Sequence, residues 1–196
     1  MTLFSQKEKI DLINFAHQTL ETYVETRKIP PLPQTLPEAF QKKAALFVRL
    51  YSHEELRGKA GVFEEKEPLC LVLQNMVIQA GTGDPNNLPI QRGEVKSIQI
   101  EIIYIYDFKP VTDMADVQLG HHGLYLTVEN KTGYLFPEIA TQHKWNVGEF
   151  LGMLGQKAGL PSNAWQFKNA KVWTFQTQTI SDVLLHQPQT GTQRNG

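Results

Sequence analysis

Apolar residues alternate with other residues over part of the chain and recur at helical spacing elsewhere, so the pattern predicts both strands and helices. The clearest strand covers residues 94–108, in which the alternating positions are Ile98, Ile100, Ile102 and Tyr104. Successive side chains of a strand point to opposite faces, so these four positions share one face. We therefore expect this face to lie against a core that is covered by helices.

The first helix is predicted at residues 5–28. Its apolar positions fall three or four residues apart and line one face: Ile10, Ile13, Ala16, Leu20 and Val24. Ser5, followed three residues later by Glu8, matches a capping box, in which each side chain accepts a hydrogen bond from the other's backbone N–H. Residues 29–37 are rich in proline, which cannot continue a helix, so we expect a linker or an extended arm there.

The rest of the chain divides into shorter elements. Strands are predicted at residues 43–52, 59–64 and 170–180, and helices at residues 67–83, 137–145 and 146–160. Pro68 is expected in the first turn of its helix, and Asn146 with Glu149 predicts a second capping box. Residues 121–138 should form a hairpin with Asn-Lys-Thr-Gly between its strands, and residues 52–61, SHEELRGKAG, should join the first two strands.

The order of these elements predicts the fold class. Hairpins and helices alternate without a regular strand–helix–strand rhythm, so the predicted fold is α+β, with a largely antiparallel sheet covered by helices. We expect a single compact unit over residues 1–185, with room for two subdomains and a cleft between them. The polar tail, residues 186–196, is expected to be disordered.

Composition and charge exclude several classes of function. The 196 residues are 41% apolar and carry a net charge of −1, which argues against non-specific binding to nucleic acid. No apolar run is long enough to span a bilayer, and the N-terminus lacks the apolar core of a signal peptide. We therefore expect a cytoplasmic protein without a membrane partner, with a nuclear location as the alternative in a eukaryotic cell.

Candidate metal ligands and nucleophiles are few. Cys70 is the only cysteine, which rules out an intrachain disulfide and a cysteine-based metal site. It lies in the apolar run LCLVL, so we predict a buried residue and no thiol-dependent catalysis. His121 and His122 are interpreted as turn residues, because adjacent strand residues point to opposite faces and cannot share one ion. No metal site and no cofactor is predicted, since phosphate-loop, serine-elbow and zinc-protease motifs are also missing from the sequence.

Several segments, taken in order, resemble one family. They are LRGKAG at 56–61, the following helix, Asp84-Pro85, the strand with IEI at 100–102, HHGLYL at 121–126, and GYLFPEIATQHKWNVGEFLGMLGQKAGLPSNAW at 133–165. This order resembles the AMMECR family over nearly the whole chain, from the first helix to about residue 180. The C-terminal string is the most specific part of the resemblance.

The chain departs from the family's motifs at two places. The signature motif of the family is Leu-Arg-Gly-Cys-Ile-Gly, and here Lys59 stands in place of the cysteine and Ala60 in place of the isoleucine. The family's Asp-Pro-Arg-Phe is matched by Asp84-Pro85, but Asn86-Asn87 replaces the last two residues. Chemistry that rests on the cysteine as nucleophile or ligand is closed to this chain, because an amine is neither a thiolate nor a soft ligand.

Two interpretations of the motif stay open. In the first, Gly58 and Gly61 let a ligand approach closely, Arg57 offers a rigid fork of donors, and Lys59 adds a charge on the same side of an extended segment. These residues would form an anion-reading patch at the edge of a cleft, with Asp84 as a further contact. His122 is also a candidate ligand contact.

In the second interpretation, Arg57 pairs internally with an acid, either Glu101 or Glu55, and holds the strands in register. We favour a mixed arrangement, in which the stem of Arg57 is packed and its guanidinium is held by an acid at the edge of the cleft, with Glu101 as the best candidate. Lys59 is then mainly a solvated side chain.

The resemblance implies no defined reaction, so three functions stay open and no catalytic residue is assigned. The first is a binding domain for an anionic small molecule or peptide, or for a protein partner, at a cleft near LRGKAG. The second is an enzyme or enzyme subunit, because in prokaryotes the family is often encoded near, or fused to, Memo-like and radical-SAM proteins, which implies a shared modification pathway. The third is a nucleic-acid-associated factor, in which Trp145, Trp165 or Trp173 could stack bases, although core or lid roles are simpler.

Overall fold

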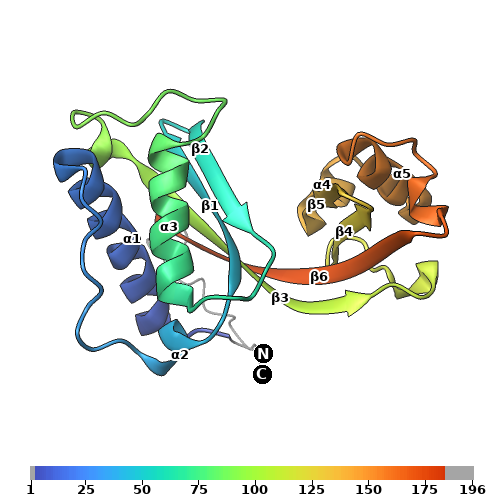
Figure 1. Ribbon diagram of the computed structural model, residues 1–196, viewed down its shortest axis with the longest axis horizontal. Helices are drawn as coiled ribbons and strands as arrows, with labels where there is room; N and C mark the ends of the chain where they lie inside the picture. Colours follow the sequence, from blue (N-terminus) through green and yellow to red (C-terminus); the bar gives the residue numbers. More distant parts are fainter. Residues whose placement is uncertain (1–2, 184–196) are drawn as a thin grey trace, which may run out of the picture. The chain divides into compact units, whose positions relative to one another are not determined.

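The structure is a computed structural model that describes residues 3–183 (Figure 1). The strands are β1 (Ala45–Ser52), β2 (Glu55–Val62), β3 (Gln99–Pro110), β4 (Gly123–Val128), β5 (Lys131–Leu135) and β6 (Ala170–Ser181). The α-helices are α1 (Gln6–Thr26), α2 (Glu38–Gln41), α3 (Leu69–Thr82), α4 (Pro137–Gln142) and α5 (Val147–Lys157). Short 3-10 helices are η1 (Val95–Ser97), η2 (Met114–Asp116) and η3 (Ala164–Gln166).

The six strands form one sheet in the order β2-β1-β3-β6-β4-β5. The pairs β1–β2, β4–β5 and β4–β6 are antiparallel. The predicted α+β class is therefore confirmed. In the described part of the chain, no helix is both long enough and apolar enough to cross a membrane. The predicted tail at 186–196 lies outside the described residues.

The chain divides into two compact units. Unit 1 comprises Met1–Tyr104 and Thr179–Gly196, and unit 2 comprises Ile105–Gln178. Both boundaries fall inside strands, because β3 runs from unit 1 into unit 2 and β6 runs back. Unit 2 is thus one continuous segment inserted between the two parts of unit 1.

In unit 1, α1 and α3 lie side by side and cover one face of the strands (Figure 1). The helix α1 begins with the predicted capping box, since Glu8 N–H donates to Ser5 Oγ and Ser5 N–H donates to Glu8 Oε2. Leu20 of α1, Leu73 of α3 and Leu50 of β1 are fully buried in one hydrophobic cluster. The alternating residues join the same cluster, as predicted: Ile98, which directly precedes β3, and Ile100, Ile102 and Tyr104 of β3.

Unit 2 has a hydrophobic cluster of its own between the β4–β5 hairpin and the helices. Phe150 and Leu154 of α5 and Leu126 of β4 are fully buried in it. The capping box predicted at the start of α5 is present, because Asn146 N–H donates to Glu149 Oε2 at 2.8 Å and Glu149 N–H donates to Asn146 Oδ1 at 3.0 Å.

Several predicted boundaries were wrong by a few residues. The strand predicted at 59–64 begins at Glu55, because the turn before it consists only of His53 and Glu54, both with positive φ. Two-residue turns of this kind match the twist of paired strands, and they need fewer residues than the predicted linker. Likewise, the second hairpin turns at Glu129 (φ 56°) and the next residue, so Asn-Lys-Thr-Gly is mostly strand β5.

Two further predictions need correction. Residues 94–98, predicted as strand, form η1 and its flanks, because Ser97 N–H and the following amide bond back to carbonyls three residues earlier. Pro68 is the N-cap of α3 rather than a residue of its first turn. Its φ of −55° suits either position, but its extended ψ of 145° suits only the N-cap, and the missing N–H is not needed in either.

Candidate functional site

The strand β2 carries the LRGKAG segment as a bulged edge strand. The register across β1 and β2 is Arg49–Lys59, Leu50–Gly58, Tyr51–Leu56. Arg57 therefore has no partner position on β1 and is the extra residue of a β-bulge, a feature that bends a strand and redirects a side chain. The prediction that Arg57 and Lys59 extend to the same side assumed a regular strand, and the bulge interrupts that regular alternation.

Both motif glycines are required by packing. A Cβ on Gly58 would collide with the carbonyl oxygen of Ala80 in α3, and a Cβ on Gly61 would collide with the ring of Phe47. Gly58 thus faces α3, and Gly61 lies against a side chain on the opposite face of the hairpin. The close approach predicted at these glycines is made by the protein's own groups.

Asp84 ties the loop after α3 to the edge of β2. Its Oδ2 accepts a hydrogen bond from the backbone N–H of Lys59 at 2.8 Å and from the side-chain amide of Asn87 at 3.1 Å. Its Oδ1 accepts from the backbone N–H of Asn86 at 2.9 Å and from the Asn86 amide at 3.2 Å. The carboxylate therefore occupies an amide that an edge strand would otherwise leave open.

The same hydrogen bonds keep Asp84 ionised. Burial alone would raise the pKa of this carboxyl, but the bonds from the backbone N–H groups of Asn86 and Lys59 and from two amide side chains outweigh it and lower the pKa. Asn86 and Asn87, which depart from the family's Arg-Phe, thus serve as donors to the carboxylate. Asp84 is a structural anion in this chain.

Arg57 is held by Glu94, not by Glu101 as predicted. Its Nη2 donates to both carboxylate oxygens of Glu94, at 2.9 Å and 3.2 Å. Both side chains are mostly buried, with exposed fractions of 23% and 27%. Burial would raise the pKa of Glu94, but the hydrogen bonds from the Gln91 N–H and from Arg57, together with the guanidinium charge, lower it.

Arg57 therefore pairs with an acid inside the protein, as predicted, but the acid is Glu94 and not Glu101. Glu101 instead accepts a hydrogen bond from Arg49 Nη1 at 3.1 Å. Arg49 lies directly opposite Lys59 across the hairpin, and the side chain of Lys59 is exposed. Lys59, Arg49 and Glu101 therefore form a row across three neighbouring strands, on the face that points away from α3. We call this row the basic row.

The remaining predicted residue, His122, lies in unit 2 and apart from the motif in the chain. Its Nδ1 accepts a hydrogen bond from the backbone N–H of Gln118 at 3.2 Å, which fits the predicted role as a turn histidine. It also lines a polar hollow of about 540 Å³ with Asp107, Thr174 and Gln176. Within residues 3–183, no three His, Cys, Asp or Glu side chains are grouped so that they could hold a metal ion.

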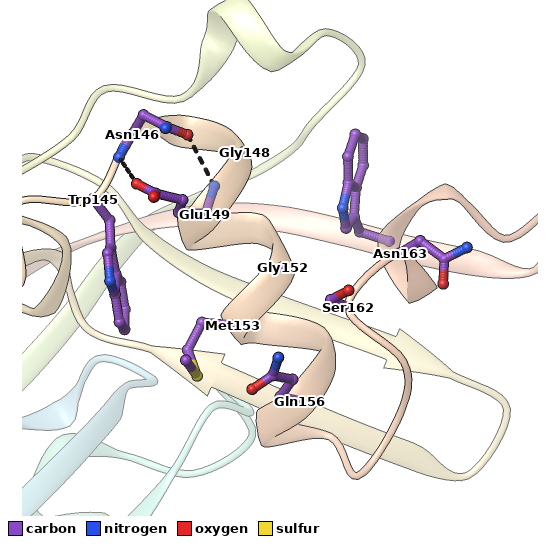
Figure 2. Close-up of a pocket in the computed structure, with 10 residues that line it drawn as sticks. Trp145, Asn146, Gly148, Glu149, Gly152, Met153, Gln156, Ser162 and Asn163 are labelled. Carbon is purple, nitrogen blue, oxygen red and sulfur yellow. Dashed lines mark hydrogen bonds between the residues drawn. The ribbon is translucent and has the colours of Figure 1, made fainter.

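A second hollow of unit 2 runs along α5 (Figure 2). Its volume is about 570 Å³. It is lined by two tryptophans, two helix glycines, one methionine and a set of polar side chains: Trp145, Asn146, Gly148, Glu149, Gly152, Met153, Gln156, Ser162, Asn163 and Trp165. Sequence reasoning missed this hollow, since its lining combines residues 145–156, in and just before α5, with residues 162–165, which follow the helix.

Comparison with known proteins places the chain in a family. The family model AMMECR1 matches residues 13–180. The chain belongs to the AMMECR1 family. Protein MJ0810 of Methanocaldococcus jannaschii is 29% identical over 191 residues, which cover 93% of this chain and 94% of that protein. A protein of Methanothermobacter thermautotrophicus is 32% identical over 184 residues, which cover 91% of this chain and 96% of that protein.

A solved structure agrees with the fold. The crystal structure of uncharacterized protein PH0010 from Pyrococcus horikoshii matches with a TM-score of 0.83 and covers 91% of this chain and 93% of that chain. The sequence identity is 23%, so this likeness concerns the fold alone. The match to the AMMECR1 family model confirms the resemblance found in the sequence.

Proposed function

We propose that this AMMECR1-family protein is a binding domain for an anionic ligand, and that Lys59 reads the charge of that ligand. The proposal rests on one observation. The guanidinium of Arg57 donates to Glu94, and the backbone amide of Lys59 donates to Asp84, so both groups are engaged within the protein. The side chain of Lys59, by contrast, is exposed.

The surroundings of Lys59 suit an anion. The basic row holds two cations and one carboxylate, so its formal charge is +1. Like charges on directly opposed strand residues destabilise a sheet unless a counter-charge lies near, and Glu101 can offset only one of the two cations. A bound carboxylate or phosphate would supply the second counter-charge.

The same face also offers apolar surface. Leu56 is 39% exposed and lies opposite Tyr51, two positions along β1 from Arg49. A ligand that carries an anionic group beside an apolar group would contact both parts of this face. We therefore place a peptide or small acid of this kind ahead of a bare inorganic ion.

The resemblance places a cysteine where this chain has Lys59, and a thiol shares little chemistry with an ammonium group. The cysteine and the lysine would share only their position, an exposed site on β2 between two packed glycines, Gly58 and Gly61. A role in contacting a ligand survives such an exchange, whereas a role as thiolate nucleophile does not.

The acids near the motif favour binding over catalysis. Asp84 and Glu94 both accept hydrogen bonds from the chain, and both have lowered pKa values. A general acid or base at neutral pH needs a pKa near the working pH and a free site for the proton. Neither carboxylate meets these conditions.

The test uses two probes of different size, inorganic phosphate and the peptide acetyl-Glu-Leu-Glu-amide. Each is titrated into ¹⁵N-labelled protein while the backbone amides of residues 55–62 are followed by NMR. We expect saturable shifts with the peptide, weakened about fivefold by Lys59→Ala, since an exposed charge pair contributes up to about 1 kcal/mol. Lys59→Arg should retain binding, and Lys59→Glu should abolish it.

Lys7→Glu is the matched control, because Lys7 is an exposed lysine in the first turn of α1. The substitution changes the net charge by the same amount as Lys59→Glu. It should leave the titration unchanged. If neither probe shifts these amides, or if Lys7→Glu weakens binding as much as Lys59→Glu does, the proposal is wrong.

A further inference from the structure

The hollow along α5 has the features of a ligand site, and it belongs to unit 2 rather than to the unit that carries the basic row. Two indole rings form part of its lining. Trp145 and Trp165 are half-buried, and both pack against the hydrophobic cluster of unit 2, which fixes their positions. Trp145 has one face stacked on His143, with ring centroids 4.5 Å apart and planes 13° apart, so a ligand can use only its other face.

The floor of the hollow is kept low by glycine. Gly148 and Gly152 lie one turn apart on α5, and Figure 2 shows Gly152 between Trp145 on one side of the helix and Ser162 on the other. A Cβ added at Gly152 would make only ordinary contact with Ser162, at 3.6 Å. The fold therefore tolerates alanine at this position, and alanine would also favour the helix. The absence of a side chain at Gly152 therefore leaves space in the hollow, and packing around the helix does not require that space.

Polar groups with unused hydrogen-bonding capacity stand around the hollow. The side chains of Gln156, Ser162 and Asn163 are exposed, and among residues 3–183 none of them has a hydrogen-bond partner. Amides and hydroxyls can each donate and accept, which is also what the hydroxyl groups of a ligand do. Flat apolar rings together with such groups are the usual composition of a small-molecule site.

The charge of the hollow argues against one class of ligand. Of the described residues that line it, Glu149 alone is charged, and its Oε2 accepts the capping hydrogen bond from Asn146 N–H at 2.8 Å. No lining residue is a lysine or an arginine. A phosphate or carboxylate would therefore meet one negative charge and no cation, so the lining disfavours an anionic ligand.

We propose that this hollow binds a neutral, hydroxyl-bearing ring, that is, a sugar, with its C–H face against an indole and its hydroxyl groups bonded to the amides and the serine. The volume of about 570 Å³ lies in the range of about 300–1,000 Å³ that is typical of small-molecule sites. This site is independent of the anionic ligand proposed for Lys59.

Intrinsic tryptophan fluorescence offers a direct assay, because two of the three tryptophans line the hollow and Trp173 does not. The probes are glucose, N-acetylglucosamine, ribose, maltose and cellobiose, with adenosine as a planar aromatic and AMP as its charged form. At least one sugar should change the emission in a saturable way. Trp145→Ala and Trp165→Ala should each weaken its binding up to about tenfold, and Trp173→Phe should not.

Gly152→Ala separates binding from folding. It should weaken or abolish sugar binding by filling the floor of the hollow, while the melting temperature stays the same or rises. The proposal is overturned if none of the five sugars binds, if adenosine binds and the sugars do not, or if sugar binding survives both tryptophan variants. Since the sugars are neutral and the variants lie in unit 2, the sugar results do not depend on those of the Lys59 titration.

Discussion

Replacing Asp84 by asparagine tests how the edge of β2 is held. The change keeps the shape of the side chain but turns one oxygen into an NH₂ donor. In the native protein Oδ1 and Oδ2 each accept two hydrogen bonds, and each receives one of them from a backbone N–H. Whichever way the new amide is turned, its NH₂ group faces donors, so at least one backbone N–H loses its acceptor.

The magnitude follows from these contacts. Asp84 is buried, with 8% of its surface exposed, so water cannot easily replace the lost acceptor. A hydrogen bond to a charged group contributes about 1.5–3 kcal/mol, and an unsatisfied buried donor costs about 1–3 kcal/mol. We therefore expect Asp84→Asn to lower the free energy of unfolding by about 3 kcal/mol at neutral pH.

The pH dependence has a definite sign. The pKa of Asp84 is lowered in the folded protein, so the ionised carboxylate stabilises the fold fully above the unfolded value of about 3.9. This contribution is lost as the pH falls through the lower, folded pKa. The difference between the native protein and Asp84→Asn should thus be constant at neutral pH and shrink below about pH 4.

Urea unfolding at several pH values measures the loss of stability, and hydrogen exchange of the Lys59 amide reports the bond itself. Asp116→Asn is the control, because Asp116 also accepts several hydrogen bonds but lies exposed in unit 2, where water can replace them. If Asp84→Asn changed stability by less than about 0.5 kcal/mol and left the exchange of that amide unchanged, the role given to Asp84 would be refuted.

Three further outcomes are expected. Arg57→Lys and Glu94→Gln should each lower the free energy of unfolding in urea by about 1–2 kcal/mol. The double variant should lose less than the sum of the two, because both changes remove the same hydrogen bonds, and additive losses would contradict the pairing. Gly58→Ala should cost about 3 kcal/mol, because the added methyl meets a backbone carbonyl, whereas Gly93→Ala, with open space around it, should stay within about 0.5 kcal/mol. Cys70→Ser should cost about 1–2 kcal/mol by placing a hydroxyl in the core and leave the peptide titration unchanged; lost binding at unchanged stability would instead indicate a functional thiol.

The sequence predicted most of what depends on local pattern. The capping boxes at Ser5 and Asn146, and the buried face of β3, follow from residue types at fixed spacing, and all are present. Element boundaries were less accurate where a two-residue turn replaced a longer linker, as at His53 and Glu54. Turn length depends on the register of the paired strands, which neither strand specifies by itself.

The candidate site depends on register and on the path of loops, and there the sequence was a poorer guide. Arg57 was correctly expected to meet an acid, but Glu94 lies 37 residues away in a loop whose path is set by α3 and by the bonds to Asp84. The bulge that redirects Arg57 becomes visible only when β1 is paired with β2. The hollow along α5 depends on bringing Trp145 near residues 162–165, and no periodicity in the sequence signals that approach.

The insertion of unit 2 within β3 and β6 has a consequence for the order of synthesis. Unit 1 needs the end of β6, because Ile180 is buried in its cluster and Asp182 accepts a hydrogen bond from the Ile100 N–H at 2.7 Å and lies 3.0 Å from Nε2 of His17. His17 and Asp182 are separated by 165 residues, which a ribosome adds in roughly 8–30 s. Unit 2 is contiguous and is complete at Gln178, just before the last residues of β6 emerge. Unit 1, which begins the chain, is therefore the last to complete its fold. Until β6 has been synthesised, β3 has only β1 as a neighbouring strand.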